Sequence, residues 1–125
     1  MADLLFEEES YAIRGAVFEV YKELNCGYLE AVYQECLAVE FRRRNIPYDW
    51  KPQLRLNYKG EQLSAFYVPD FICYGQIIIE IKVATGLGPE HEAQVINYLK
   101  STGLKLGLLV NFGTFPHVQI KRFVL

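Results

Sequence analysis

The chain has 125 residues, of which 51% are hydrophobic and 22% charged, values typical of one globular domain that exclude an intrinsically disordered protein. The formal net charge of −2 lacks the basic excess of a dedicated duplex-binding protein. The three cysteines include no CxxC pair, which argues against a zinc or iron–sulfur centre and favours a reducing compartment.

The first ten residues are acidic and have neither the basic nor the apolar region of a signal peptide. No apolar run approaches the ~20 residues that a membrane-spanning helix needs. These features predict a cytoplasmic protein that forms a single domain over residues 1–125 and has no membrane association.

Two helices are predicted in the first part of the chain. Residues 10–24 carry apolar side chains at three- and four-residue steps, and the sequence Asn25-Cys26-Gly27 then ends the helical pattern. A second helix is expected over residues 29–44, because its apolar stripe continues until Asn45-Ile46-Pro47.

The period of the apolar residues then changes to two. Residues 54–58 and 63–67 alternate around a turn at Lys59-Gly60, which predicts a hairpin whose return strand continues toward Asp70. Residues 77–83 carry apolar side chains on both faces, so this strand is expected at the centre of a sheet.

A third helix is predicted over residues 90–101, followed by strands over residues 104–110 and 118–123. The predicted order is therefore two helices, three antiparallel strands, one helix and two strands. This order indicates an α/β fold with one mixed central sheet flanked by helices.

Charged residues interrupt the apolar stretch VPDFICYGQIIIEIKV, which covers residues 68–83. Asp70, Glu80 and Lys82 need an explanation there, because an unpaired buried ion costs several kcal/mol. Glu80 and Lys82 are two residues apart and share one strand face. Asp70 joins that face only if the connecting loop has an odd number of residues or contains a bulge, and Gly75 would permit a three-residue loop with a glycine bulge.

Two carboxylates beside an ammonium group suit Mg²⁺ or Mn²⁺, which prefer oxygen ligands. The ammonium would then orient a nucleophile or stabilise charge on a phosphate. The alternative is a structural ion pair between the lysine and the carboxylates, or an edge site that water reaches.

The residues Pro69-Asp70 and Glu80-Ile81-Lys82 resemble the signature of the PD-(D/E)XK, or restriction-endonuclease-like, nuclease superfamily. Residues 94–98 read QVINY and resemble the QxxxY element of its RecB-like members. Residues 27–33 read GYLEAVY and resemble the pattern of the bacterial GxxExxY family within that superfamily, as does the segment HEAQVINYLKSTGLKLGLLVNFG.

This resemblance implies a restriction-endonuclease-like core and a role for each matching position. Asp70 and Glu80 would bind the metal, together with Glu30 and the backbone carbonyl of Ile81, and Lys82 would be the catalytic lysine. The other two matching residues, which would steady the site and the nucleic-acid backbone, are Gln94 and Tyr98.

Each assignment has an alternative in ordinary structure. Glu30 could serve only the dipole of its helix, Tyr98 could pack in the core, and Gln94 could bind a nearby loop. His91 is expected at a helix start without a catalytic role. The basic run of residues 42–44 is expected to complement a helix C-terminus rather than to bind phosphates, and no alternation of basic and aromatic residues indicates a platform for single strands.

The sequence thus predicts a Mg²⁺- or Mn²⁺-dependent nuclease that hydrolyses phosphodiester bonds of nucleic acid, with DNA favoured over RNA, and acts as a homodimer or a subunit of a larger assembly. The alternative is a catalytically silent binding or regulatory module on the same fold. An active enzyme is favoured because Asp70, Glu80, Lys82 and Glu30 are all present.

Overall fold

The computed structural model describes residues 5–125, and the first four residues of the acidic N-terminal stretch lie outside the described part. Three helices and seven strands follow one another within this range. The helices are α1 (Glu7–Leu24), α2 (Glu30–Arg43) and α3 (Pro89–Thr102). The strands are β1 (Tyr48–Trp50), β2 (Leu54–Tyr58), β3 (Glu61–Tyr67), β4 (Phe71–Cys73), β5 (Ile77–Lys82), β6 (Leu106–Asn111) and β7 (Gln119–Val124).

Five of the strands form one mixed sheet in the order β1-β4-β5-β6-β7. Strands β5 and β6 are parallel, as the crossover through α3 requires, and the other neighbours pair antiparallel. The predicted α/β class with a mixed central sheet is confirmed.

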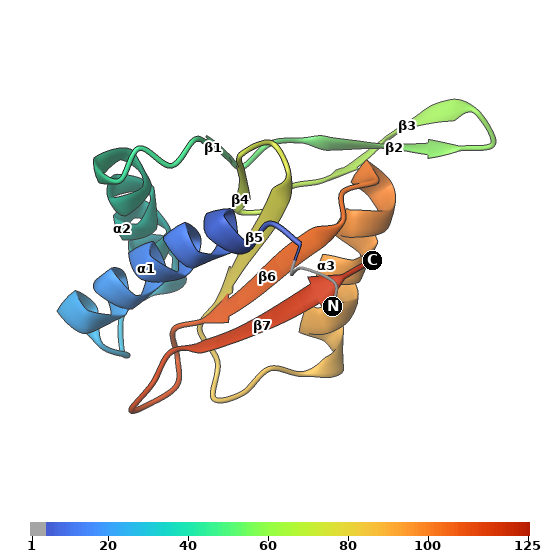
Figure 1. Cartoon of the computed structure of the whole chain (residues 1–125). Coiled ribbons are helices and arrows are strands. Elements are labelled where there is room, and N and C mark those ends of the chain that lie inside the picture. The colour runs from blue at the N-terminus through green and yellow to red at the C-terminus, as the bar shows by residue number, and fades with distance from the viewer. Residues whose placement is uncertain (1–4) are drawn as a thin grey trace, which may run out of the picture.

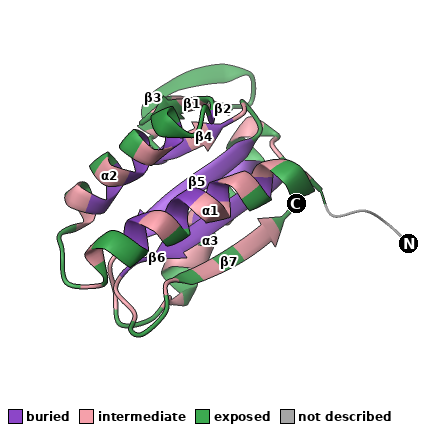
Figure 2. Cartoon of the chain, turned by 60° about the vertical axis from the view of Figure 1, so that its left-hand side comes forward, coloured by how far each residue is buried: buried purple, intermediate pink, exposed green. Residues whose placement is uncertain are grey.

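The sheet is covered on both faces (Figure 1). Helices α1 and α2 lie over one face and α3 lies over the other. Strands β5 and β6 form the buried centre (Figure 2). On β5, Ile79 packs with the α1–α2 layer and Ile78 packs with α3, so alternation directs Glu80 toward the α3 side.

The prediction of a single sheet was wrong. Strands β2 and β3 pair only with each other in a separate two-stranded sheet. The return strand stops at Tyr67 and resumes as β4 at Phe71, because Pro69 has no N–H group to donate to a strand ladder. The freed edge of β4 is taken by β1, a three-residue strand that the sequence did not predict.

Across residues 5–125, none of the helices combines the length and the apolar character needed to cross a bilayer.

Candidate active site

The turn between β4 and β5 sets the register of the polar side chains. The loop has three residues, 74–76, and both Tyr74 and Gly75 have positive φ angles, of 57° and 64°. Phe71 pairs with Ile79, so one further step along the strands sets Asp70 opposite Glu80. Opposed residues point to the same face, and the predicted sharing of a face is confirmed.

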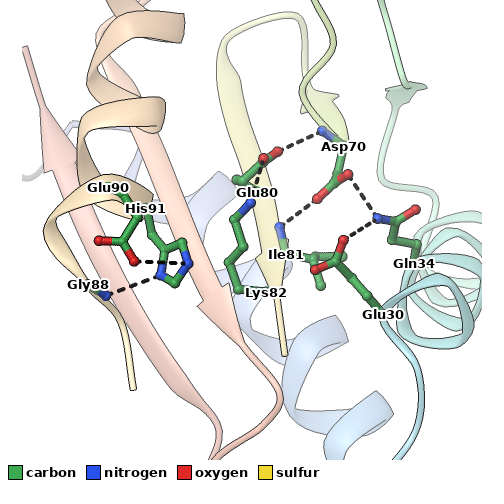
Figure 3. A network of polar contacts seen from close by, with 9 residues as sticks. All are labelled: Glu30, Gln34, Asp70, Glu80, Ile81, Lys82, Gly88, Glu90 and His91. Carbon is green, nitrogen blue, oxygen red and sulfur yellow. Dashed lines mark hydrogen bonds and ion pairs between the residues drawn. The ribbon is translucent and has the colours of Figure 1, made fainter. Parts of the chain in front are cut away.

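The two carboxylates bind the backbone where the strands stop pairing (Figure 3). The N–H of Asp70 donates to Glu80 Oε1 over 3.0 Å, and the N–H of Ile81 donates to Asp70 Oδ2 over 2.7 Å. Beyond Phe71 the ladder opens, so these N–H groups would otherwise lack partners. Each carboxylate therefore fixes the position of the other's strand.

Lys82 adds a positive charge beside this pair. Its Nζ lies 3.5 Å from Glu80 Oε2, on the same strand face. The Glu80 side chain is 5% exposed and the Lys82 side chain 21% exposed. The ammonium group thus stands between the buried carboxylate and solvent, where an incoming anion could reach it.

Helix α2 contributes a third carboxylate, that of Glu30, and Gln34 of the same helix connects it to Asp70. The sequence analysis did not identify Gln34. Gln34 Nε2 donates to Asp70 Oδ1 over 3.0 Å and lies 3.4 Å from Glu30 Oε2. Gln34 is buried at 7% exposure. The signal available in the sequence was its position four residues after Glu30, which places both side chains on one face of the helix.

Helix α3 approaches the site from the other layer. Tyr98 is buried against Tyr67, with ring centroids 5.3 Å apart. Burial, followed by the charge of Glu80, raises the pKa of Tyr98. Gln94, one turn earlier, is half-buried. His91 Nδ1 accepts the N–H of Gly88 over 3.1 Å at the helix N-terminus, so the predicted helix-start position is confirmed.

Burial and mutual repulsion dominate the electrostatics of the carboxylates. Burial, with a smaller contribution from the charge of Asp70, raises the pKa of Glu80 to about 8, against the opposing effect of Lys82. Burial also raises the pKa of Asp70, and the N–H of Ile81 partly offsets that rise. For Glu30, burial and then the charge of Asp70 raise the pKa. The Glu80 carboxyl therefore keeps its proton to a higher pH than a free glutamate does.

A family model described as the PD-(D/E)XK nuclease superfamily matches residues 7–123. The chain belongs to this superfamily. Among solved structures, the crystal structure of SSO0001 is similar, with a TM-score of 0.59 and 17% identity over 95% of this chain and 59% of that one. The chain thus spans about three fifths of SSO0001, and the likeness concerns the fold. The search of curated proteins finds no match.

The donor set of this superfamily member fits a hard divalent cation. Within residues 5–125, no three His, Cys, Asp or Glu side chains converge as a ready-made metal cage. The available donors are nevertheless all oxygen atoms, namely those of the Asp70, Glu80 and Glu30 carboxylates. Mg²⁺ and Mn²⁺ prefer oxygen ligands of this kind. Burial and the neighbouring carboxylates disfavour the ionised forms of Glu30 and Glu80, and burial disfavours that of Asp70, whereas a bound cation would favour the ionised forms.

Hydrogen bonds from the end of β6 and the residue after it hold the segment that begins at Lys82. Asn111, fully buried, accepts the N–H of Ala84 over 3.0 Å and donates to its carbonyl over 2.9 Å. The N–H of Phe112 donates to the carbonyl of Lys82 over 3.0 Å. A Cβ on Gly113 would lie 2.5 Å from backbone atoms of Ala84, so this position has no room for a side chain.

The basic run at residues 42–44 does not join the site. Arg44 pairs with Glu40 over 3.1 Å and Arg42 donates to the hydroxyl of Tyr48 over 3.0 Å. These residues stand at the C-terminus of α2, and a helix of 14 residues places them ~20 Å from Glu30. Their position agrees with the predicted role at the helix C-terminus.

Proposed function

We propose that this chain is a divalent-metal-dependent nuclease that hydrolyses phosphodiester bonds of nucleic acid, with DNA as the favoured substrate. The observation that carries the proposal is the interlocked pair Asp70–Glu80 with the Lys82 ammonium 3.5 Å from Glu80. Membership of the PD-(D/E)XK superfamily supports it. We further assign the chain to the GxxExxY family through residues 27–33 and to the QxxxY-bearing members through residues 94–98.

In this proposal, Asp70 and Glu80 hold the cation, and the carbonyl of Ile81 and the carboxylate of Glu30 complete the site. A bound Mg²⁺ or Mn²⁺ supplies Lewis acidity at the phosphate and a water of lowered pKa. Gln34 keeps Asp70 and Glu30 oriented through its amide group.

The remaining chemistry belongs to the protein side chains. The ammonium of Lys82 orients the attacking water and stabilises negative charge that builds on the phosphate oxygens. Water adds to phosphorus, the P–O ester bond breaks, and the leaving oxygen takes a proton, which yields one phosphate end and one hydroxyl end. Gln94 and Tyr98 support the site from α3.

The test is cleavage of supercoiled plasmid and of single- and double-stranded oligonucleotides in Mg²⁺ or Mn²⁺, with chelator as the blank. Glu80→Gln keeps the size of the side chain and should abolish cutting. Glu35→Gln, at an exposed position of α2, is the matched control and should cut like the wild type.

Lys82→Ala separates catalysis from metal binding. It should retain Mn²⁺ binding by calorimetry while its cleavage rate falls by about 10²–10³-fold, as for loss of one charge-stabilising donor. Lys105→Ala, on an exposed residue before β6, serves as control. Metal binding without cutting of any substrate by the wild type would instead support the catalytically silent module.

A further inference from the structure

The β2–β3 hairpin leaves the core of the protein (Figure 1). Its two strands pair only with each other, and six consecutive residues of β3, 61–66, are exposed. At its base, Leu54 and Tyr67 pack against the α3 side of the core, and β2 also lies against the last turn of α3. A free two-stranded hairpin is marginally stable in water, so its exposed surface calls for a partner.

The exposed residues of the hairpin and of the segment before it include three aromatic rings. Tyr58 is 61% exposed, and Phe66 and Trp50 are each 42% exposed. A cation lies over every one of these rings. The distances to the ring centroids are 5.5 Å for Lys59 over Tyr58, 5.4 Å for Arg55 over Phe66 and 5.6 Å for Lys51 over Trp50.

Two of these pairs are neighbours in the chain, but the third forms only when the hairpin folds, so the sequence alone shows no regular alternation of rings and cations. Arg55 and Phe66 are directly opposed in the β2–β3 register, although eleven positions separate them in the chain. Interleaved rings and cations match the chemistry of a single strand of nucleic acid, because exposed bases stack on the rings and phosphates meet the cations. A paired duplex hides its base faces and could use the cations alone.

Local charge also favours a nucleic acid. Residues 48–67 contain three Lys and Arg against two Asp and Glu, whereas the whole chain has 13 against 15. A pocket between β2 and the last turn of α3 is lined by Arg55, Leu56, Asn57, Lys100 and Ser101, two of them cations and none a carboxylate. Such a lining suits a phosphate group.

The hairpin is continuous with the candidate active site. The N–H of Lys51 donates to the carbonyl of Asp70 over 2.9 Å. At the other end, β3 leads through Val68-Pro69 directly into Asp70. A strand bound along the hairpin would therefore run to the carboxylates.

We propose that the β2–β3 hairpin, together with Trp50 and Lys51, is a single-strand-binding arm that stacks unpaired bases and leads the backbone to Asp70 and Glu80. This inference rests on the proposed nuclease function and narrows its substrate class to nucleic acid with unpaired bases. The exposed residues 61–66 of β3 extend over ~20 Å at strand spacing, enough for several nucleotides.

The experiment measures binding without cleavage. Fluorescence anisotropy follows a labelled 20-nucleotide single strand of DNA and its duplex on the full chain, in chelator and at low salt. The wild type should bind the single strand more tightly. Phe66→Leu keeps the apolar volume but loses the ring face and should raise the dissociation constant about tenfold, whereas Phe66→Trp should retain the affinity.

Tyr11→Leu is the matched control, because Tyr11 is 81% exposed on α1, far along the chain from the hairpin. It should bind like the wild type, and circular dichroism checks that each variant is folded. Equal affinity for strand and duplex, no binding by the wild type, or unchanged affinity of Phe66→Leu would each overturn the proposal. So would a concentration-dependent dimer that Phe66→Leu abolishes while strand binding persists, because the arm would then serve a second copy.

The two proposals fail separately. Strand binding that depends on Phe66, with no cutting in any metal, would leave the arm standing and remove the nuclease function. Cutting that depends on Glu80, with Phe66→Leu binding and cutting as the wild type does, would leave the nuclease function standing and remove the arm.

Discussion

The hairpins β2–β3 and β4–β5 follow each other directly in the chain, yet they place their side chains in opposite environments. In β4–β5, charged groups are buried among isoleucines, and every oxygen of Asp70 and Glu80 meets a donor or the Lys82 ammonium. In β2–β3, aromatic rings are exposed among cations. Buried charge and exposed apolar surface are both costly, and each indicates a functional demand.

The largest expected difference between the hairpins is in stability. Phe71 on β4 is fully buried against Phe41, Tyr48 and Trp50, so Phe71→Ala should lower the free energy of unfolding by about 3–5 kcal/mol. Phe66→Ala on β3 should change it by about 0.5 kcal/mol or less. Urea denaturation measures both, and equal losses would mean that the exposed hairpin belongs to the cooperative core.

The next largest effect concerns the protonation of Glu80 in the buried β4–β5 hairpin. A raised pKa means that the folded state keeps the Glu80 proton to higher pH than the unfolded chain. The contribution of Glu80 to stability without metal should therefore be fully present below the ordinary pKa of 4.5 and be lost as the pH rises through about 8. Glu80→Gln cannot ionise and should be more stable than the wild type at pH 8.

Thermal or urea unfolding at several pH values, in chelator, measures this difference. Glu35→Gln, on the exposed face of α2, should follow the wild-type curve. A Glu80→Gln variant that loses stability with pH as steeply as the wild type would show that another group carries the dependence.

A smaller effect is expected at Gln34. Gln34→Leu removes the donor to Asp70 Oδ1 and should cost about 1–2 kcal/mol of stability, with Mn²⁺ affinity reduced about tenfold. Gln62→Leu, at an exposed position of β3, should change neither quantity. Urea denaturation and calorimetry with Mn²⁺ provide the two readings, and unchanged Mn²⁺ affinity would assign Gln34 to packing alone.

The smallest effect concerns the salt dependence of single-strand binding. Arg43→Gln, on the exposed C-terminal turn of α2, should leave the salt dependence of single-strand binding unchanged. Lys59→Gln should reduce the logarithmic slope by about 0.7, the contribution of one phosphate contact. Anisotropy over a salt series compares them, and an equal change in both would move the basic run into the binding surface.

The sequence predicted the buried hairpin better than the exposed one. The loop at residues 74–76 could be inferred because Gly75 and the buried charges together demanded an odd length. Strand β1 escaped detection because three residues are too few for a period-two pattern. The separate sheet of β2–β3 was missed because alternation reports a strand but not its partner.

The candidate site divides in the same way. Residues that belong to a motif, such as Asp70 and Lys82, could be found from spacing within the chain. Gln34 and the pairing of Arg55 with Phe66 depend on how a helix packs and how two strands register. Such contacts exist only once the chain is folded, so no local pattern encodes them.

The lack of room at Gly113 has a consequence for reading natural variation. Any larger residue there would push Ala84 and, through the carbonyl bonded to Phe112, the end of the strand that carries Lys82. A substitution in the connection between β6 and β7 would then resemble a catalytic defect in an assay. Its origin would lie in a displaced main chain, and a variant screen should treat this connection as part of the candidate active site.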